Sequence, residues 1–138
     1  MFSKANVTST ILTAIWGFGG GYLLWGYLSV DFFSDHMGSA TGVMKEVPDM
    51  VYLLLGCLIN GFAFSTIYGK WANGKFSAGS GISFGIWIAV LMGLGEGLID
   101  YATSNILDLT GMLANVVIWI VFLGIMGLVA GIAYNKSS

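Results

Sequence analysis

Four long apolar stretches, separated by short polar segments, dominate the pattern of hydrophobic and polar positions along the chain. They run approximately over residues 7–30, 50–69, 79–103 and 112–134. Each reaches the roughly 20 residues that a helix needs to cross a hydrocarbon core about 30 Å thick. None shows the alternation of a membrane β-strand. Because the connections are short, the pattern predicts an all-α membrane protein, a single domain over residues 1–138 with four transmembrane helices as sequential antiparallel neighbours.

The composition agrees with this prediction. The chain has 138 residues, is 57% hydrophobic and 9% charged, and has a mean hydropathy of +0.85, whereas soluble domains contain about 25% charged residues. A surface this poor in charge suits a lipid bilayer, and nothing in it suggests nucleic-acid binding. Glycines four apart let apolar helices approach closely, within one chain, in a homo-oligomer or in a larger membrane complex. The pairs are Gly17/Gly21, Gly81/Gly85, Gly93/Gly97 and Gly127/Gly131.

The lysines predict the orientation of the helices. With four spans, the side that holds both termini carries Lys4, Lys70, Lys75 and Lys136, and the other side carries only Lys45. Positive-inside bias therefore predicts that both termini lie in the cytoplasm. Acids gather on the outer side, at helix ends and in loops, where charge is commonly just solvated. They are Asp31, Asp35, Glu46, Asp49 and Asp108.

Two further acids lie inside the third apolar stretch. Glu96 and Asp100, in the segment GLGEGLIDYAT (residues 93–103), are four positions apart and share one helix face. Glu96 lies about 7 Å outside the helix midpoint at 1.5 Å per residue. Ionisable residues inside a span usually point into the bundle and mark ion or substrate paths. With Asp31 at the outer end of the first helix, these acids form a candidate polar pocket for a cation or proton, open to the outer side.

Structural roles for the same residues remain open. Asp31 and Asp100 are near enough to helix ends to reach the interface. An ionised Glu96 costs about 2–3 kcal/mol at its depth, and burial favours its neutral form. A neutral Glu96 bonded to Asn60 or Asn115 would be a structural clasp, and both asparagines therefore join the candidate site residues.

The two halves of the chain resemble each other, over residues 7–69 and 76–136. Two such hairpins in one orientation would be related by a pseudo-twofold axis along the membrane normal, as in membrane transport folds. The matching positions are Gly26/Gly95, Asp31/Asp100, Phe32/Tyr101 and Thr41-Gly42/Thr110-Gly111 at one constant offset, then Gly61/Gly127, Tyr68/Tyr134 and Lys70/Lys136 after a small gap.

Classical active-site chemistry is scarce in this composition. The chain has one histidine, one cysteine and no arginine. His36 follows Asp35 on the outer side, but a catalytic metal usually takes three protein ligands, so we expect a solvated histidine and no metal or cofactor. Cys57 has no disulfide partner in the chain and is expected to be a small buried side chain. The sequence therefore predicts a protein that is not an enzyme.

Several segments carry a resemblance to known proteins. They are GYLLWGYLSVDFF, EVPDMVYLLLG and YGKWANGKFSAGSGISFGIWIAVLMGLGEGLIDYATSNILDLTG. They resemble small four-helix membrane proteins of bacteria that carry no assigned function. In those proteins an acid followed by aromatics ends the first helix, and an acid–aromatic pair, Thr/Asn and a Leu-Thr-Gly turn end the third. The resemblance covers nearly the whole chain. It implies the fold, the topology and a bacterial inner membrane, and it implies no substrate, cofactor or catalytic residue.

Three classes of function stay open. The first is permeation or transport of a cation, proton or small solute, favoured by the two like-oriented hairpins and the outer acids. The second is a non-catalytic structural or accessory subunit of a larger membrane complex, favoured by the small size and the lack of a strong motif. A lipid-binding protein or membrane enzyme comes third.

Overall fold

Helices make up most of the computed structural model, which describes residues 2–43, 45 and 47–137. Those residues contain no strand and only a single isolated β-bridge. They contain four helices long and apolar enough to cross a membrane, Lys4–Leu28, Met50–Ala72, Ala78–Thr103 and Leu109–Ser137. The predicted all-α class with four long apolar helices is confirmed.

The first and third long helices change their winding partway. The first comprises α1 (Lys4–Gly21), the π-helical segment η1 (Tyr22–Leu28) and, beyond Ser29, α2 (Val30–Asp35). The third comprises α4 (Ala78–Ala89), the π-helical segment η2 (Val90–Gly95) and α5 (Glu96–Thr103). The second and fourth are the single α-helices α3 (Met50–Ala72) and α6 (Leu109–Ser137). π-helical turns are rare and often lie at functional sites, and η2 leads directly into Glu96.

Short polar side chains set where three of the helices begin. Ser3 accepts a hydrogen bond from the Asn6 backbone N–H at 3.1 Å, so α1 starts before residue 7 and includes polar residues that hydropathy alone left out. The side chain of Asp49 accepts from the first backbone N–H groups of α3. Ser77 and Ser80 form a capping box at the start of α4. Each cap satisfies backbone donors that a helix start leaves unpaired.

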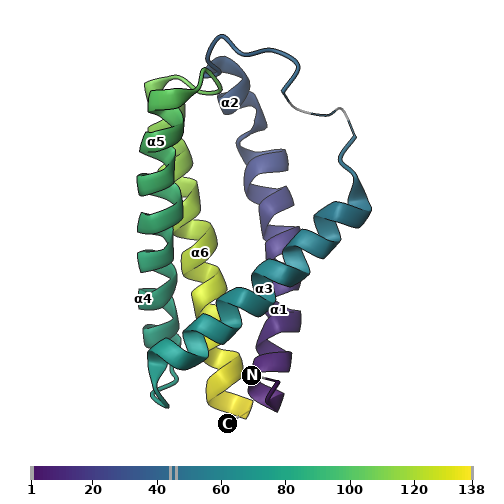
Figure 1. The fold of residues 1–138 in the computed structure, drawn as a ribbon, viewed down its shortest axis with the longest axis vertical. Helices are drawn as coiled ribbons and strands as arrows, with labels where there is room; N and C mark the ends of the chain where they lie inside the picture. The colour runs from purple at the N-terminus through teal and green to yellow at the C-terminus, as the bar shows by residue number, and fades with distance from the viewer. Residues whose placement is uncertain (1, 44, 46, 138) are drawn as a thin grey trace.

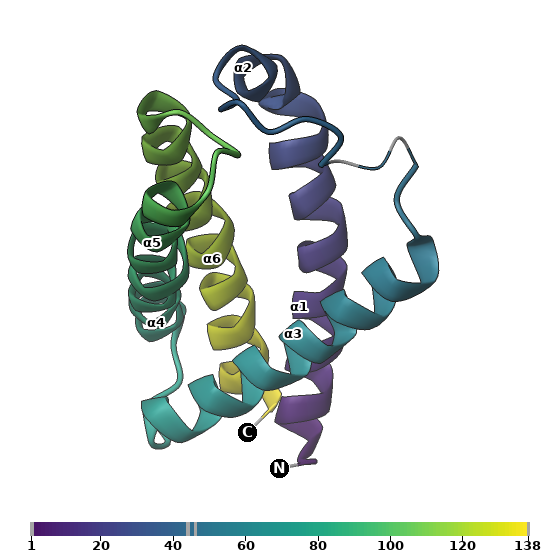
Figure 2. The same ribbon diagram turned by 45° about the horizontal axis from the view of Figure 1, so that its top comes forward.

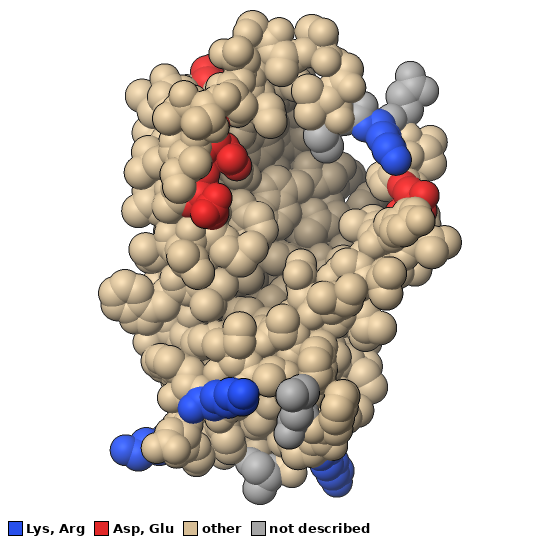
Figure 3. All heavy atoms as spheres, viewed as in Figure 1, with Lys and Arg blue, Asp and Glu red and all other residues tan. Residues whose placement is uncertain are grey.

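The long helices differ in direction, as Figures 1 and 2 show. α1, α6 and the α4–η2–α5 helix lie along the long axis of the molecule, and α3 crosses obliquely in front of them. Both termini lie at one end, here called the terminal end. The opposite end, called the loop end, holds residues 36–43 and 104–108. Figure 3 shows basic side chains gathered at the terminal end and acidic side chains in the half toward the loop end. Glu46 lies outside the described residues.

Glycines bring α4 and α6 into backbone contact. A Cβ built on Gly81 would lie closer than 3.0 Å to the carbonyl oxygen of Gly127, and one on Gly127 would meet the Gly81 oxygen equally closely. Gly85 faces the Leu123 carbonyl and Gly131 faces the Ser77 carbonyl in the same way. Two of the predicted glycine pairs therefore join helices within the chain. Gly17/Gly21 differs, because a Cβ there would meet only side-chain atoms at ordinary contact distance.

A buried polar seam joins α1 to the half of α3 nearest the terminal end. Ser9 and Ser65 share a hydrogen bond at 2.7 Å, and the Thr13 hydroxyl reaches the Gly61 carbonyl oxygen at 3.3 Å. All three side chains are fully buried. A Cβ on Gly61 would lie within 3.0 Å of the Thr10 carbonyl oxygen, so the two backbones nearly touch there. This junction fixes α3 at one end only.

Candidate functional site

A cavity of about 240 Å³ lies at mid-height between α1, α3, α6 and the α4–η2–α5 helix. It exists because α3 leans away from the other helices toward the loop end. No heavy atom lies within 4 Å of a Cβ built on Gly56, halfway along that leaning stretch. Figure 3 shows the surface hollowed on this side, between α3 and the α4–η2–α5 helix. The hollow faces sideways, across the long axis.

The cavity wall is apolar and aromatic. Rings from three helices line it, namely Phe64, Phe84, Trp119 and Phe122. Asn60 adds a side-chain amide to this wall. Asn60 is exposed and makes no hydrogen bond through its side chain within the described part of the chain. The arrangement can hold an organic group with apolar flanks and can offer it one polar anchor.

Glu96 and Asp100 stand at the rim of this hollow. Met92 lines the cavity, and Glu96 follows it by four positions, about one turn nearer the loop end on the same face. Asp100 lies one further turn along. Both side chains are exposed, and Figure 3 shows acidic side chains over α5 beside the hollow. The structure thus brings these two predicted acids together with the mouth of an apolar cavity.

Asp31 does not complete the expected trio. It is exposed in the first turn of α2. Among the described residues, no group of three His, Cys, Asp or Glu side chains lies close enough to hold a metal ion. The carboxylates at the hollow are therefore a pair, Glu96 with Asp100. Glu96 and Asp100 lie together because both are on α5, whereas Asp31 is on α2, at the end of a different long helix.

The two candidate asparagines are separated. Asn115 accepts a hydrogen bond from the Trp25 indole N–H at 2.7 Å, which joins α6 to η1. Asn115 also lines a different cavity of about 310 Å³ nearer the loop end. Within the described residues no hydrogen bond joins Glu96 to Asn60 or Asn115, so the structural clasp considered from the sequence does not form here.

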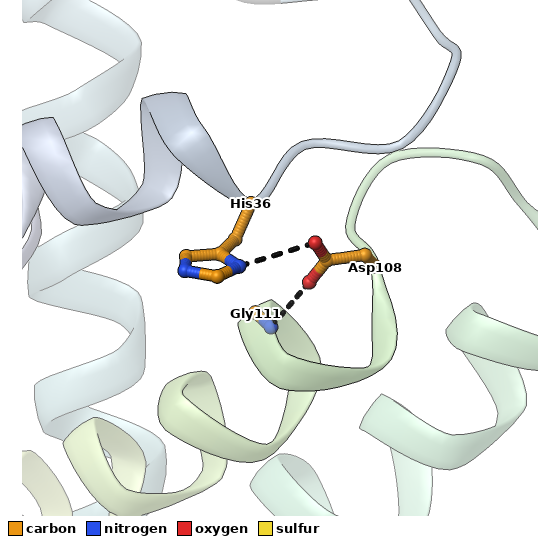
Figure 4. A network of polar contacts seen from close by, with 3 residues as sticks. All are labelled: His36, Asp108 and Gly111. Atoms are coloured by element: carbon orange, nitrogen blue, oxygen red, sulfur yellow. Dashed lines mark hydrogen bonds and ion pairs between the residues drawn. The ribbon is translucent and has the colours of Figure 1, made fainter.

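A clamp at the loop end joins residues that the sequence did not pair. His36 Nδ1 lies 3.1 Å from Asp108 Oδ2, and the backbone N–H of Asp108 donates to the His36 carbonyl at 2.9 Å. Figure 4 shows this contact together with the hydrogen bond from the Gly111 N–H to Asp108 Oδ1, at 2.7 Å. The Gly111 N–H, helped by His36, lowers the pKa of the Asp108 carboxyl from its ordinary 3.8. The expectation of a solvated His36 is wrong, since it is half-buried and bonded.

No family model matches the chain, no curated protein matches it, and no solved structure matches it. The resemblance to four-helix bacterial membrane proteins stays a prediction, and function is inferred from the geometry of the hollow and its rim.

Proposed function

We propose that this chain is an integral membrane protein of a bacterial inner membrane, with both termini in the cytoplasm. The lengths of its four apolar helices, 23 to 29 residues, support this proposal. So does the gathering of lysines at the terminal end (Figure 3). A reporter fused to the C-terminus should read as cytoplasmic, and Lys45 should be labelled by an impermeant amine reagent from outside. The opposite pattern would reverse the orientation.

The function that we propose is binding and translocation of an amphipathic organic cation. The observation that carries it is an apolar cavity whose rim holds two carboxylates, on the same helix face as the cavity-lining Met92. In a bilayer the sideways hollow would open to the acyl chains, so an apolar solute could enter without crossing water. Its positive charge would then meet Glu96 and Asp100 on the way to the loop end.

Charge and ring chemistry both favour a cation over an anion or a neutral solute. An acid inside a span costs about 2–3 kcal/mol on insertion scales, and a bound cation offsets that cost. Trp119, Phe84 and Phe122 line the cavity. A desolvated cation over such a ring gains about 2 kcal/mol. The Asn60 amide supplies a polar contact at mid-height.

Translocation requires a helix that changes position, and an internal repeat would indicate which helix moves. Features besides the sequence matches support the repeat. π-helical segments interrupt both the first and the third long helix, each shortly before an acid of the matched pair Asp31 and Asp100. At the terminal end the matched Tyr68 and Tyr134 contact each other, with ring centroids 5.5 Å apart. Tyr68 bonds Ser80 near the start of the third helix, and Tyr134 bonds Asn6 near the start of the first.

The halves differ in the helix that follows. α6 runs beside α4 and η2, whereas α3 diverges from the bundle toward its N-terminal end at Met50 (Figures 1 and 2). α6 also packs against α1 and η1 of the other half, and an α3 that packed against α4 and η2 in the same way would fill the cavity. We therefore propose that α3 pivots near Gly61 between the open position and this closed one, releasing the solute.

The test compares two ions of the same shape and opposite charge in nanodiscs. Tetraphenylphosphonium should bind at least about tenfold more tightly than tetraphenylborate, with quenching of tryptophan fluorescence. Glu96→Gln should remove this preference. Asp35→Asn, which changes an exposed acid at the end of α2, should keep it. Equal binding of the two ions, or equal loss in both variants, would refute a cation site at Glu96.

A second function is favoured by one observation, the exposure of the half of α3 nearest the loop end. Val51 and Tyr52 are 73% and 72% exposed, and Asn60 lacks a hydrogen-bond partner in the described chain. A helix that buries this face against another copy or a larger subunit would make the protein an accessory subunit. Native mass in mild detergent discriminates the two: a defined oligomer or a stoichiometric partner that protects Asn60→Cys from labelling favours this second function.

A further inference from the structure

A second, polar cavity lies at the terminal end, far from the acids. Its volume is about 190 Å³, and it lies where α1 begins and α3 and α6 end. Ser3, Asn6, Thr66, Gly69, Lys70 and Tyr134 line it. Nothing in the proposed cation pathway uses these residues.

Asn6 has a hydrogen-bonding capacity that the described chain leaves unused. Asn6 is 2% exposed. Its Nδ2 donates to the Thr66 hydroxyl at 3.1 Å and to the Tyr134 hydroxyl at 3.0 Å. The Tyr134 hydroxyl in turn donates to the Ser65 carbonyl at 2.8 Å. Asn6 Oδ1 is buried and receives no donor within the described residues. Buried acceptors are rarely left so, which points to a missing N–H or O–H group at this cavity.

The charge around the cavity is positive. Lys70, in the last turn of α3, lines it with an exposed side chain. The first turn of α1, which carries the positive end of the helix dipole, has no acidic residue. No acid lines the cavity among the described residues. A ligand that fits must therefore combine an anionic group with a hydrogen-bond donor.

We propose that this cavity binds the headgroup of a phospholipid that carries an ammonium or hydroxyl donor beside its phosphate. The phosphate lies against Lys70, Ser3 and the start of α1, and the donor bonds Asn6 Oδ1. The inference rests on the membrane insertion proposed above and is independent of the cation cavity. Its position supports a lipid, because Lys70 and the exposed Trp71 lie in the last turns of α3, and basic and aromatic side chains at a helix end are typical of a membrane interface. Soluble phosphate esters share this chemistry.

The test uses two lipids with the same phosphate and the same net charge. Phosphatidylethanolamine has N–H donors, whereas phosphatidylcholine has none. Native mass spectrometry of wild-type protein released from an equimolar mixture should show about tenfold more retained phosphatidylethanolamine. Lys70→Gln should lower retention of both lipids, because both carry the same phosphate, and Lys70→Arg should leave retention at the wild-type level. Lys75→Gln, a matched change in the exposed turn outside the cavity, should also leave retention at the wild-type level.

Three outcomes would overturn the proposal. The first is equal retention of the two lipids by wild type, since the donor would then be irrelevant. The second is an equal loss in Lys70→Gln and Lys75→Gln, which would indicate only diffuse attraction to charge. The third is displacement of the retained lipid by soluble phosphoethanolamine at the same concentration, which would make the ligand a solute. Both glutamine variants change exposed lysines, so loss of folding is not expected.

Discussion

The backbone contact between α4 and α6 carries the sharpest stability prediction. A methyl group at Gly127 would meet the Gly81 carbonyl oxygen closer than 3.0 Å. Because that oxygen belongs to a helix backbone, it cannot rotate away, and the two helices must separate. Overpacking of this kind costs about 1–3 kcal/mol. A gap of about 0.5–1 Å also forfeits roughly a quarter to a half of the dispersion attraction along the contact. We therefore expect Gly127→Ala to lower the free energy of unfolding by about 2–3 kcal/mol.

Gly124→Ala is the matched control on the same helix. No heavy atom lies within 4 Å of a Cβ built there, so its free energy of unfolding should stay within about 0.5 kcal/mol of wild type. The assay is reversible unfolding in mixed micelles, followed by tryptophan fluorescence. If Gly127→Ala, Gly124→Ala and wild type have the same free energy of unfolding, α4 and α6 do not touch at this point and the described interface is wrong.

Three further predictions concern the seam, the clamp and α3. Ser9→Ala and Ser65→Ala should each cost about 1 kcal/mol, and the double variant should cost less than their sum because they share one hydrogen bond; strict additivity in the same unfolding assay would argue against the bond. The pKa of Asp108 is lowered in the folded state, so its contribution to stability is complete above its ordinary pKa of 3.8 and is lost as pH falls through the lower folded value. The protection of loop-end amides against hydrogen exchange, relative to their intrinsic rate at each pH, should therefore fall below about pH 4 in wild type and show no such step in Asp108→Asn. Cys57 should form a disulfide with the cysteine of Met92→Cys when α3 closes, and tetraphenylphosphonium should slow that reaction. A rate of disulfide formation that the ion does not change would refute a role for α3 movement in translocation.

The sequence was sufficient for the helices and for the role of two glycine pairs. Apolar length predicts four long helices, and the spacing of Gly81/Gly85 and Gly127/Gly131 predicts close approach. The partner of each pair could not be predicted, since the same spacing serves contacts within or between chains. The sequence did not predict the seam of Ser9, Thr13 and Ser65, because a hydroxyl inside an apolar helix can bond its own backbone and leaves no periodic signal.

The candidate site was predictable in part for a related reason. Helix geometry places Glu96 and Asp100 on one face whatever the tertiary structure, so the sequence alone is enough to predict that these two acids lie together. Asp31 depended on the relative placement of two helices, which local pattern does not determine. Hydropathy also could not predict that the N-terminal end of α3 leans away from the other helices, and the cavity exists only because of that angle. The Asp108 cap, in contrast, was accessible from the segment DLTG, because an aspartate three residues before Gly111 is a common helix start.

Flux of a lipophilic cation through the purified protein tests the central claim most directly. Proteoliposomes with an inside-negative potential should accumulate tetraphenylphosphonium faster than protein-free liposomes, at a rate proportional to protein content. Glu96→Gln should fall to the protein-free rate, while Asp35→Asn should match wild type, because Glu96 lies at the rim of the cavity and Asp35 lies at the end of α2. Protein-free and wild-type liposomes that accumulate the ion equally, or a Glu96→Gln rate equal to wild type, would contradict the proposal that this cavity and its carboxylate carry a cation.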